Sequence, residues 1–305
     1  MQLSGAANPP SMAPAGLRPV PAAAGIGLKP THYGELLDRR PSLAFLEVHT
    51  ENYMGAGGPP HRYLEALAAI YPLSFHGVGA SLGGADPLDP LHLARWRELV
   101  ERYEPSLISE HVAWTGHAGL ALHDLLPVPY TSEALNLLCE HIDAMQSALG
   151  RQILIENPSR YLDFLQSEMT ETEFLVQAAR RTGCRLLLDI NNVYVSACNQ
   201  DEDARAYLAE IPGELVAEIH LAGHAVRTTD SGHELRIDDH GSRVCTDVWR
   251  LYAETIERIG ARPTLIEWDT NVPALDELLD EACRADAVAA DALAAVKDVP
   301  DAAIG

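Results

Sequence analysis

Short apolar segments recur along this chain, and most of them end in a residue whose side chain can bind a metal. Eight such segments stand in the sequence, and seven of them end in histidine, asparagine or a carboxylate. The seven are residues 45–49, 73–76, 107–110, 153–157, 186–189, 216–220 and 265–267. The eighth segment, residues 24–28, ends without one. Apolar runs of this length that alternate with helical patterns predict the strands of repeated βα units in a parallel sheet.

Helices are predicted after each of these strands from periodicity, start signals and stop signals. Asp89 before Pro90 is a typical helix start, and Gly150 is a typical stop. The predicted helices are residues 31–38, 60–70, 90–103, 131–149, 172–181, 201–210, 245–259 and 273–285. Eight strands alternating with eight helices predict an α/β fold, the (β/α)8 TIM barrel. An open doubly wound sheet is the alternative, but no G-x-G-x-x-G motif follows the first strand.

The domain limits follow from composition. Residues 1–22 are rich in Pro, Ala and Gly and predict a disordered tail, residues 23–284 form the metal-binding barrel, and residues 285–305 form a second tail rich in Ala and Asp. Two loops are enlarged, residues 111–130 and 221–244. Both leave the ends of strands that carry candidate ligands, where long loops often serve function.

Charge and cysteine content exclude several classes of protein. The formal net charge is -22, which disfavours binding to a phosphate backbone, so no nucleic-acid partner is expected. Five cysteines without C-x-x-C spacing argue against a disulfide framework. Neither a signal peptide nor a membrane-spanning run is present in the sequence. We therefore expect a cytoplasmic protein that is not bound to a membrane.

The strand-end residues form the candidate active site. In a (β/α)8 barrel, the carboxyl ends of the strands converge on one face, where the active site lies. The main candidate ligands are His49, His76, Glu110, Asp189, His220 and Glu267, and the pair Asp238 and His240 follows in an enlarged loop. Several carboxylates buried together require a cation. Imidazole and carboxylate without thiolate suit zinc, iron, manganese or cobalt, and the residues alone do not choose among them.

Other polar residues near the strand ends are interpreted as supporting groups. Glu47 and Glu218 precede His49 and His220 by two positions and so share their face of the strand. They either form hydrogen bonds with the imidazoles or build a structural polar layer in the barrel. Glu156 flanks Asn157 as a further supporting group, and His111 is interpreted as a loop residue.

The sequence resembles a known family, the multinuclear non-haem iron-dependent oxidases. This family was formerly a domain of unknown function and is related to the oxidase subunit of methanobactin biosynthesis. The resemblance covers about residues 25–282. It rests on the motifs EVHTENYM at 47–54, FHGVG at 75–79, SEHVAW at 109–114, DLLPVPY at 124–130, IENPS at 155–159, LDINNVYV at 188–195, EIHLAGH at 218–224 and DDH at 238–240.

The resemblance implies a xylose-isomerase-like barrel that binds two or three iron ions in mixed ferrous and ferric states. One metal would be held by His49, His76 and Glu110. The other sites would share Glu110 as a bridge. A second metal would be held by Glu110, Asp189, His220 and Glu267, and a third by Asp238, His240 and Asn192. The resemblance also places Asn157 as a ligand or substrate-orienting group, and Glu110, Asn157 and Asp189 as catalytic residues. Related trinuclear barrels have histidine where Asn192 stands.

The activity implied by the resemblance is oxidation, with dioxygen as co-substrate, of cysteine residues in a ribosomally made precursor peptide, giving a heterocycle or thioamide. The partners would be that cysteine-containing peptide and a separate leader-binding protein. Two alternatives remain open. One is a zinc- or manganese-dependent hydrolase, isomerase or endonuclease on the same barrel, and the other is a metal-binding scaffold without activity.

Overall fold

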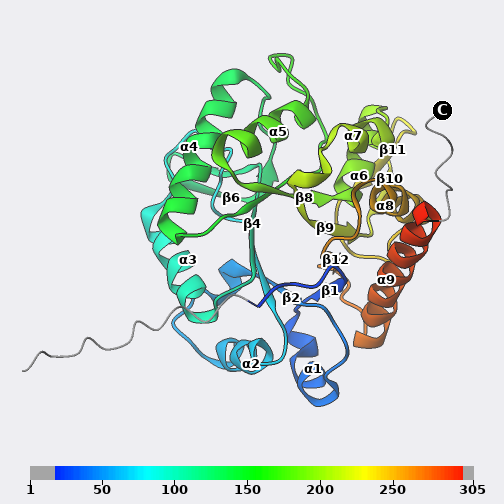
Figure 1. The fold of residues 1–305 in the computed structure, drawn as a ribbon. Coiled ribbons are helices and arrows are strands. Elements are labelled where there is room, and N and C mark those ends of the chain that lie inside the picture. Colours follow the sequence, from blue (N-terminus) through cyan, green and yellow to red (C-terminus); the bar gives the residue numbers. More distant parts are fainter. Residues whose placement is uncertain (1–17, 298–305) are drawn as a thin grey trace, which may run out of the picture.

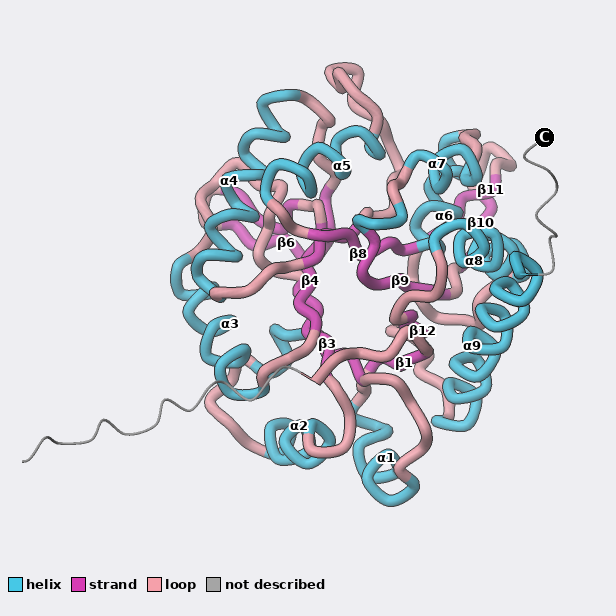
Figure 2. Tube along the Cα trace, in the orientation of Figure 1, coloured by secondary structure: helices cyan, strands magenta, loops and turns pink. Residues whose placement is uncertain are grey.

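A computed structural model describes residues 18–297 of the chain. Eight parallel strands close into a barrel in the order β1-β12-β9-β8-β7-β4-β3-β2, and the helices form a ring around it (Figures 1 and 2). The predicted (β/α)8 barrel is confirmed. The barrel strands are β1 Ala24–Gly27, β2 Leu46–His49, β3 Leu73–Gly77, β4 Leu107–His111, β7 Leu154–Glu156, β8 Arg185–Asp189, β9 Val216–Ala222 and β12 Thr264–Glu267.

The helices pack their apolar faces on the barrel and lie close to the predicted ranges. They are α1 Tyr33–Arg39, α2 Pro59–Ala68, α3 Pro90–Tyr103, α4 Ser132–Leu149, α5 Glu171–Thr182, α6 Ile190–Gln200, α7 Ala204–Glu210, α8 Thr246–Ile259 and α9 Leu275–Lys297, with the 3-10 turns η1 Pro30–His32, η2 Thr50–Tyr53 and η3 Gly213–Leu215. The predicted start and stop signals act as expected: Asp89 caps α3, and Gly150 ends α4 in the left-handed conformation. No helix in residues 18–297 combines the length and the hydropathy that crossing a membrane requires.

Two helices differ from the prediction. Helix α6 begins immediately after β8, in a segment where no helix was predicted, because the Asp189 carboxylate accepts a hydrogen bond from the Asn192 amide and caps it. Helix α9 continues to Lys297, past the boundary predicted at residue 284, as its Ala-rich sequence favours helix. Of the predicted terminal tails, residues 1–17 and 298–305 lie outside the described residues.

Both enlarged loops contain an antiparallel hairpin rather than irregular chain. The first holds β5 Trp114–His117 and β6 Leu120–Leu126, and the second holds β10 Ala225–Thr228 and β11 Glu234–Ile237. Each hairpin follows the carboxyl end of a barrel strand, so both stand at the face where the candidate ligands gather. They provide walls for a site on that face.

Candidate metal centre

The register of the barrel strands decides which side chains face the interior. His49 pairs with His76, and His76 pairs with Ser109, so these three residues share the inner face. Two residues beyond Ser109, His111 pairs with Glu156 on the same face. Glu110 lies between them in sequence and pairs with Gly77 and Ile155, so it faces the opposite side.

The inner-face residues form overlapping groups of metal-binding atoms. In each group, one atom per residue lies within 4.8 Å of the others. The groups are His76–His111–Glu156, Glu156–Asp189–His220, Asp189–His240–Glu267, His49–Glu267–Asp269 and Glu47–Glu218–His220. Glu156, Asp189, Glu267 and His220 each belong to two groups. Carboxylates shared in this way suit metals a few ångströms apart, as in multinuclear sites.

Glu156 occupies the middle of the cluster. Its Oε2 lies 3.3 Å from His76 Nε2 and 3.2 Å from His111 Nε2, and the side chain is 1% exposed. Burial raises the pKa of this carboxyl to about 7, although His111 and His220 oppose the shift. His76 in turn is oriented by Ser109, whose Oγ lies 2.8 Å from His76 Nδ1. A hydrogen bond to the second ring nitrogen fixes the orientation of a histidine that binds metal through the first.

His220 lies between two carboxylates. Its Nδ1 is 3.1 Å from Glu267 Oε2, and its Nε2 is 3.4 Å from Glu47 Oε2. Burial alone would lower the pKa of His220, but Glu47 and Glu267 outweigh it and raise that pKa well above the ordinary value. Glu218 also faces the interior, and Ser74 Oγ lies 2.9 Å from Glu47 and 3.4 Å from Glu218.

Asp189 and Asn192 are brought together by the start of α6. Asp189 Oδ1 accepts from the Asn192 backbone N–H at 2.6 Å, whereas its Oδ2 has no hydrogen-bond partner in the described structure. Asn192 donates through Nδ2 to the backbone oxygen of Asn157 at 3.1 Å, and its Oδ1 is likewise without a partner. Burial raises the pKa of Asp189 well above the ordinary value. Buried polar atoms without partners are costly, and a water molecule or a metal ion would satisfy them.

The loop pair Asp238 and His240 completes the cluster. His240 Nε2 lies 2.7 Å from Asp238 Oδ1, and its Nδ1 lies 3.4 Å from both Glu267 and Asp269. His240 adopts φ 44°, a left-handed conformation that is unfavourable for a residue with a Cβ. The backbone N–H of Asp269 donates to the His240 oxygen at 2.8 Å and holds it there. Such strain is typical of functional positions.

Two predicted site residues are placed away from the cluster. Glu110 is buried but accepts from the backbone N–H groups of Ala80 at 3.0 Å and His111 at 2.9 Å, and it belongs to none of the groups found among the described residues. The Asn157 amide pairs with the backbone of Asp189 through two 2.9 Å hydrogen bonds. Glu110 and Asn157 thus contact backbone groups, because both lie one residue off the inward-facing register, and their predicted roles as metal ligands stay predictions.

Three residues of the cluster are absent from the predicted ligand set, namely His111, Glu156 and Asp269. His111 and Glu156 are direct neighbours of Glu110 and Asn157 in sequence. The available signal was alternation, because residues of one strand that share a face are two positions apart. Which of two adjacent residues faces inward depends on the strand pairing. The strand-end pattern in the sequence therefore pointed to Glu110 and Asn157, the neighbours of the two residues that face inward.

A cleft of about 330 Å³ leads to the cluster from the face of the two hairpins. His49, His76, His111, Asn192, His240 and Glu267 contribute to its lining together with Asp124 and Leu125 of β6 and Tyr161 of the loop before α5. Ligand sites of enzymes have volumes of this order. The site is therefore both rich in metal-binding atoms and accessible to a substrate.

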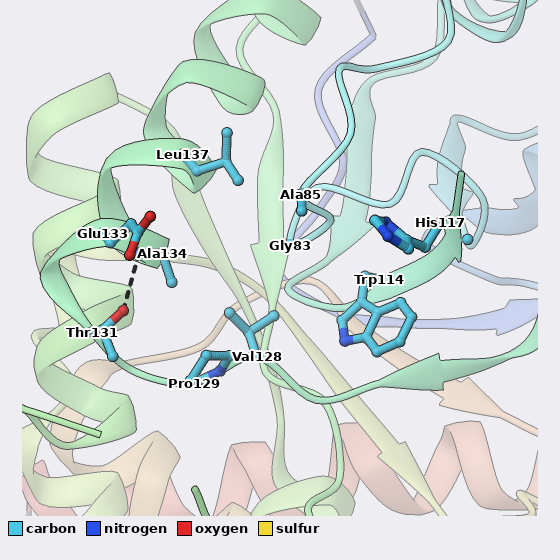
Figure 3. Close-up of a pocket in the computed structure, with 11 residues that line it drawn as sticks. Gly83, Ala85, Trp114, His117, Val128, Pro129, Thr131, Glu133, Ala134 and Leu137 are labelled. Atoms are coloured by element: carbon cyan, nitrogen blue, oxygen red, sulfur yellow. Dashed lines mark hydrogen bonds between the residues drawn. The ribbon is translucent and has the colours of Figure 1, made fainter. Parts of the chain in front are cut away.

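A separate cavity of about 320 Å³ lies between the β5–β6 hairpin and the start of α4 (Figure 3). Trp114, Val128 and Leu137 line it, and the Trp114 Nε1 donates to the Pro127 oxygen at 2.8 Å. None of the metal-binding groups in the described residues includes a residue of this cavity. The candidate centre is thus the cluster within the barrel and not this surface cavity.

Comparison with solved structures shows that other proteins share this TIM-barrel fold. The chain superposes on endonuclease IV from Thermus thermophilus with a TM-score of 0.57 at 14% identity, covering 88% of this chain and 99% of that one. It superposes on a D-psicose 3-epimerase solved with D-fructose with a TM-score of 0.54 at 13% identity, covering 91% and 99%. At such identities, the likeness concerns the fold.

Sequence comparison then gives the family. The model of the RiPP precursor modification enzymes MbnB/TglH/ChrH matches residues 23–290, where RiPP denotes a ribosomally synthesised and post-translationally modified peptide. A UPF0276 protein of Paraburkholderia phytofirmans is 49% identical over 278 residues, covering 91% of this chain and 89% of that protein. A UPF0276 protein of Bordetella pertussis is 50% identical over 275 residues, covering 90% and 95%. The chain belongs to the MbnB/TglH/ChrH family, and the predicted resemblance is confirmed.

Proposed function

We propose that this protein is a multinuclear iron-dependent oxidase that uses dioxygen to modify cysteine residues of a ribosomally made precursor peptide. The observation that carries the proposal is the chain of overlapping donor groups at the floor of an open cleft, in a member of a family of peptide-modifying enzymes. Membership in this family of enzymes supports catalysis over the role of an inactive scaffold.

The donor set fits several metal ions. Carboxylate, amide and imidazole atoms converge in the barrel, Lys29 pairs only with Asp269 at the edge of the cluster, and buried oxygens of Asp189 and Asn192 have no hydrogen-bond partner among the described residues. Cations would supply the missing countercharge. The proposed holders are His76, His111 and Glu156 for one metal, Glu156, Asp189, Asn192 and His220 for a second, and His49, Asp238, His240, Glu267 and Asp269 for the remainder.

Iron in these sites would supply electrons to dioxygen and a Lewis-acidic position for a substrate thiolate. The protein's own residues contribute orientation and exclusion of water. Asn157 fixes the backbone of Asp189, and Ser109 fixes the His76 ring. Glu110 accepts a hydrogen bond from the backbone N–H of Ala80, two residues after Val78 in the cleft wall. These hydrogen bonds keep the ligands in place while one face of the cluster stays open to the cleft.

A cysteine-containing peptide is the proposed substrate, and a separate leader-binding protein is the proposed second partner. The cleft is bounded by β6 and by the loop that carries Tyr161, so an extended segment can reach the cluster between them. The five cysteines of the chain itself are free, and none belongs to a metal-binding group of the described residues. In this proposal the thiol that reacts is supplied by the substrate.

The test is anaerobic purification with iron, metal analysis, and coexpression with a cysteine-containing precursor peptide encoded nearby, followed by mass spectrometry. We expect two or three irons per chain, consumption of dioxygen, and loss of hydrogen mass at cysteine. The Glu156→Gln variant should abolish the mass change, whereas Glu110→Gln is the matched comparison outside the cluster. Zinc at full occupancy without dioxygen consumption or peptide mass change would instead indicate the hydrolase or isomerase alternative.

A further inference from the structure

Strand β1 contributes no side chain to the ring of strand-end residues. Gly25 pairs with Leu265 and Gly27 pairs with Glu47, so both glycines face the barrel interior. Side chains normally fill the interior of such a barrel. The Phe45 ring fills the space at Gly25, where an added Cβ would lie 2.6 Å from it, whereas Gly27 leaves space beside the candidate metal centre. Figure 1 shows β1 next to β2 and β12, the strands that carry His49 and Glu267.

A second cavity of about 280 Å³, here called the β1 cavity, occupies that space. Pro30 and Asn52, both exposed, lie among its lining residues, and so do the buried residues Glu47 and Glu267. His49 and Glu267 line this cavity and also line the substrate cleft. Two cavities therefore reach the same pair of candidate ligands, and one of them runs past β1.

Several polar groups on the wall of this cavity already have partners within the protein. The Tyr33 and Tyr53 hydroxyls lie 2.6 Å apart, Lys29 pairs with Asp269, and Glu47 accepts from Ser74 Oγ at 2.9 Å. The remaining wall includes Leu28, Pro60 and Leu265. A charged or strongly hydrogen-bonding ligand would find few free partners here. The wall suits a small uncharged molecule.

We propose that this β1 cavity is the passage by which dioxygen reaches the metal centre. The inference rests on the proposed function, which requires dioxygen as co-substrate. A peptide that fills the cleft would cover the cleft's approach to His49 and Glu267. The β1 cavity meets the same two residues and keeps a small molecule's route open while the peptide is bound.

A larger side chain at Gly27 would block the passage. A Cβ placed on Gly27 would meet Lys29 Cε at 3.6 Å and Nζ at 3.9 Å, ordinary van der Waals distances, and its φ is not in the left-handed region. Gly27→Val therefore adds volume at a position whose backbone conformation accepts a Cβ, and β-branched residues suit strands. Gly27→Ala is a milder version. Gly34→Ala is the control, because a Cβ at Gly34 meets nothing within 4 Å.

The first measurement is diffraction from xenon-pressurised crystals of the metal-loaded full chain, because bound xenon marks a cavity that a small apolar molecule can enter and occupy. We expect xenon in the β1 cavity of the wild type and of Gly34→Ala, and none in Gly27→Val. Ordered water without xenon in the wild-type cavity would overturn the proposal. This measurement does not depend on turnover, so it stands even where the oxidase reaction fails.

The second measurement is the dependence of peptide oxidation on dioxygen concentration. Gly27→Val is expected to raise the apparent KM for dioxygen about tenfold, with a smaller rise for Gly27→Ala and an unchanged KM for peptide. Metal content should match the wild type in all variants. An unchanged dioxygen KM in a metal-loaded Gly27→Val protein would refute the passage but leave the proposed function intact. A wild type that consumes no dioxygen with its peptide would refute the proposed function.

Discussion

Buried carboxylates gather in two regions of this protein, and the two clusters are neutralised differently. Between α5 and α7, the buried Glu171 is paired with Arg160 at 2.9 Å, and that guanidinium also binds Asp163 and Glu202. In the barrel, Glu47, Glu156 and Glu267 have only histidines as ion-pair partners among the described residues. At the edge of that cluster, Asp269 alone has a lysine, Lys29.

The difference indicates which of the two clusters requires an added cation. A carboxylate buried without a cation is strongly disfavoured, and the Arg160 cluster satisfies this requirement internally. Buried oxygens lack hydrogen-bond partners in both clusters, Asp189 Oδ2 and Asn192 Oδ1 in the barrel and Glu171 Oε1 beside Arg160, but Glu171 has a guanidinium as its ion-pair partner and Asp189 has none among the described residues. One cluster already contains its cation, whereas the other receives its cation as metal in our proposal. The following predictions test that contrast.

The largest effect is expected from removing metal. Dialysis against a chelator should abolish turnover and lower the Tm, because the barrel carboxylates lose their countercharge. Activity assays and thermal scans before and after dialysis check this, with reloading by ferrous iron as the control. An unchanged Tm and activity would mean that the barrel cluster, like the Arg160 cluster, needs no added cation.

The next effect is the difference between two glutamates that are close in space but face opposite ways. Glu156→Gln should reduce metal content and lower turnover by about 100-fold or more, because Glu156 is shared by two groups. Glu110→Gln should retain its metals, because that carboxylate binds backbone N–H groups instead. Metal analysis of both variants shows which of the two carboxylates binds metal. Equal metal loss in the two would return Glu110 to the ligand set.

The Arg160 cluster should respond in stability rather than in metal content. Arg160→Met leaves Glu171 buried without its cation and should lower the free energy of unfolding by roughly 3 kcal/mol. Replacing both partners, Arg160→Met with Glu171→Leu, should recover much of that loss, since an apolar pair carries no unpaired charge. Denaturant unfolding of the two variants provides the measurement. Metal loss in Arg160→Met would contradict the independence of the clusters.

The last prediction is a pH dependence of stability that is caused by Glu171, and its size does not exceed that of the Arg160→Met effect. Burial raises its pKa from 4.5 to about 7, although Arg160 opposes the shift. An acid with a raised folded-state pKa stabilises the protein less as pH rises, so stability should fall between pH 4.5 and 7 and then level off. The contribution is about 3 kcal/mol at most. Glu171→Gln should flatten this part of the stability profile, and an unchanged profile would assign the dependence elsewhere.

The sequence predicted the barrel and most of the residues that meet at its centre. The strand-end pattern predicted that His49, His76, Asp189, His220 and Glu267 share one face, and the structure brings them together in the groups described above. Asp238, His240 and Asn192 also lie in or beside these groups. The role of these residues as metal ligands stays a prediction. Apolar periodicity and strand ends are local properties of the chain, so they follow from the order of residues alone.

What only the tertiary structure decided is the direction in which neighbouring side chains point. Glu110 and His111 are adjacent, as are Glu156 and Asn157. Both residues of each pair can bind a metal, so residue type alone does not tell which of the two faces the barrel interior. The pairing of His111 with Glu156 across β4 and β7 turns those two inward and their neighbours away. A shift of one residue in register reverses every side chain of a strand. Register is set by contacts between distant strands, so the identity of the shared carboxylate is a property of the closed barrel.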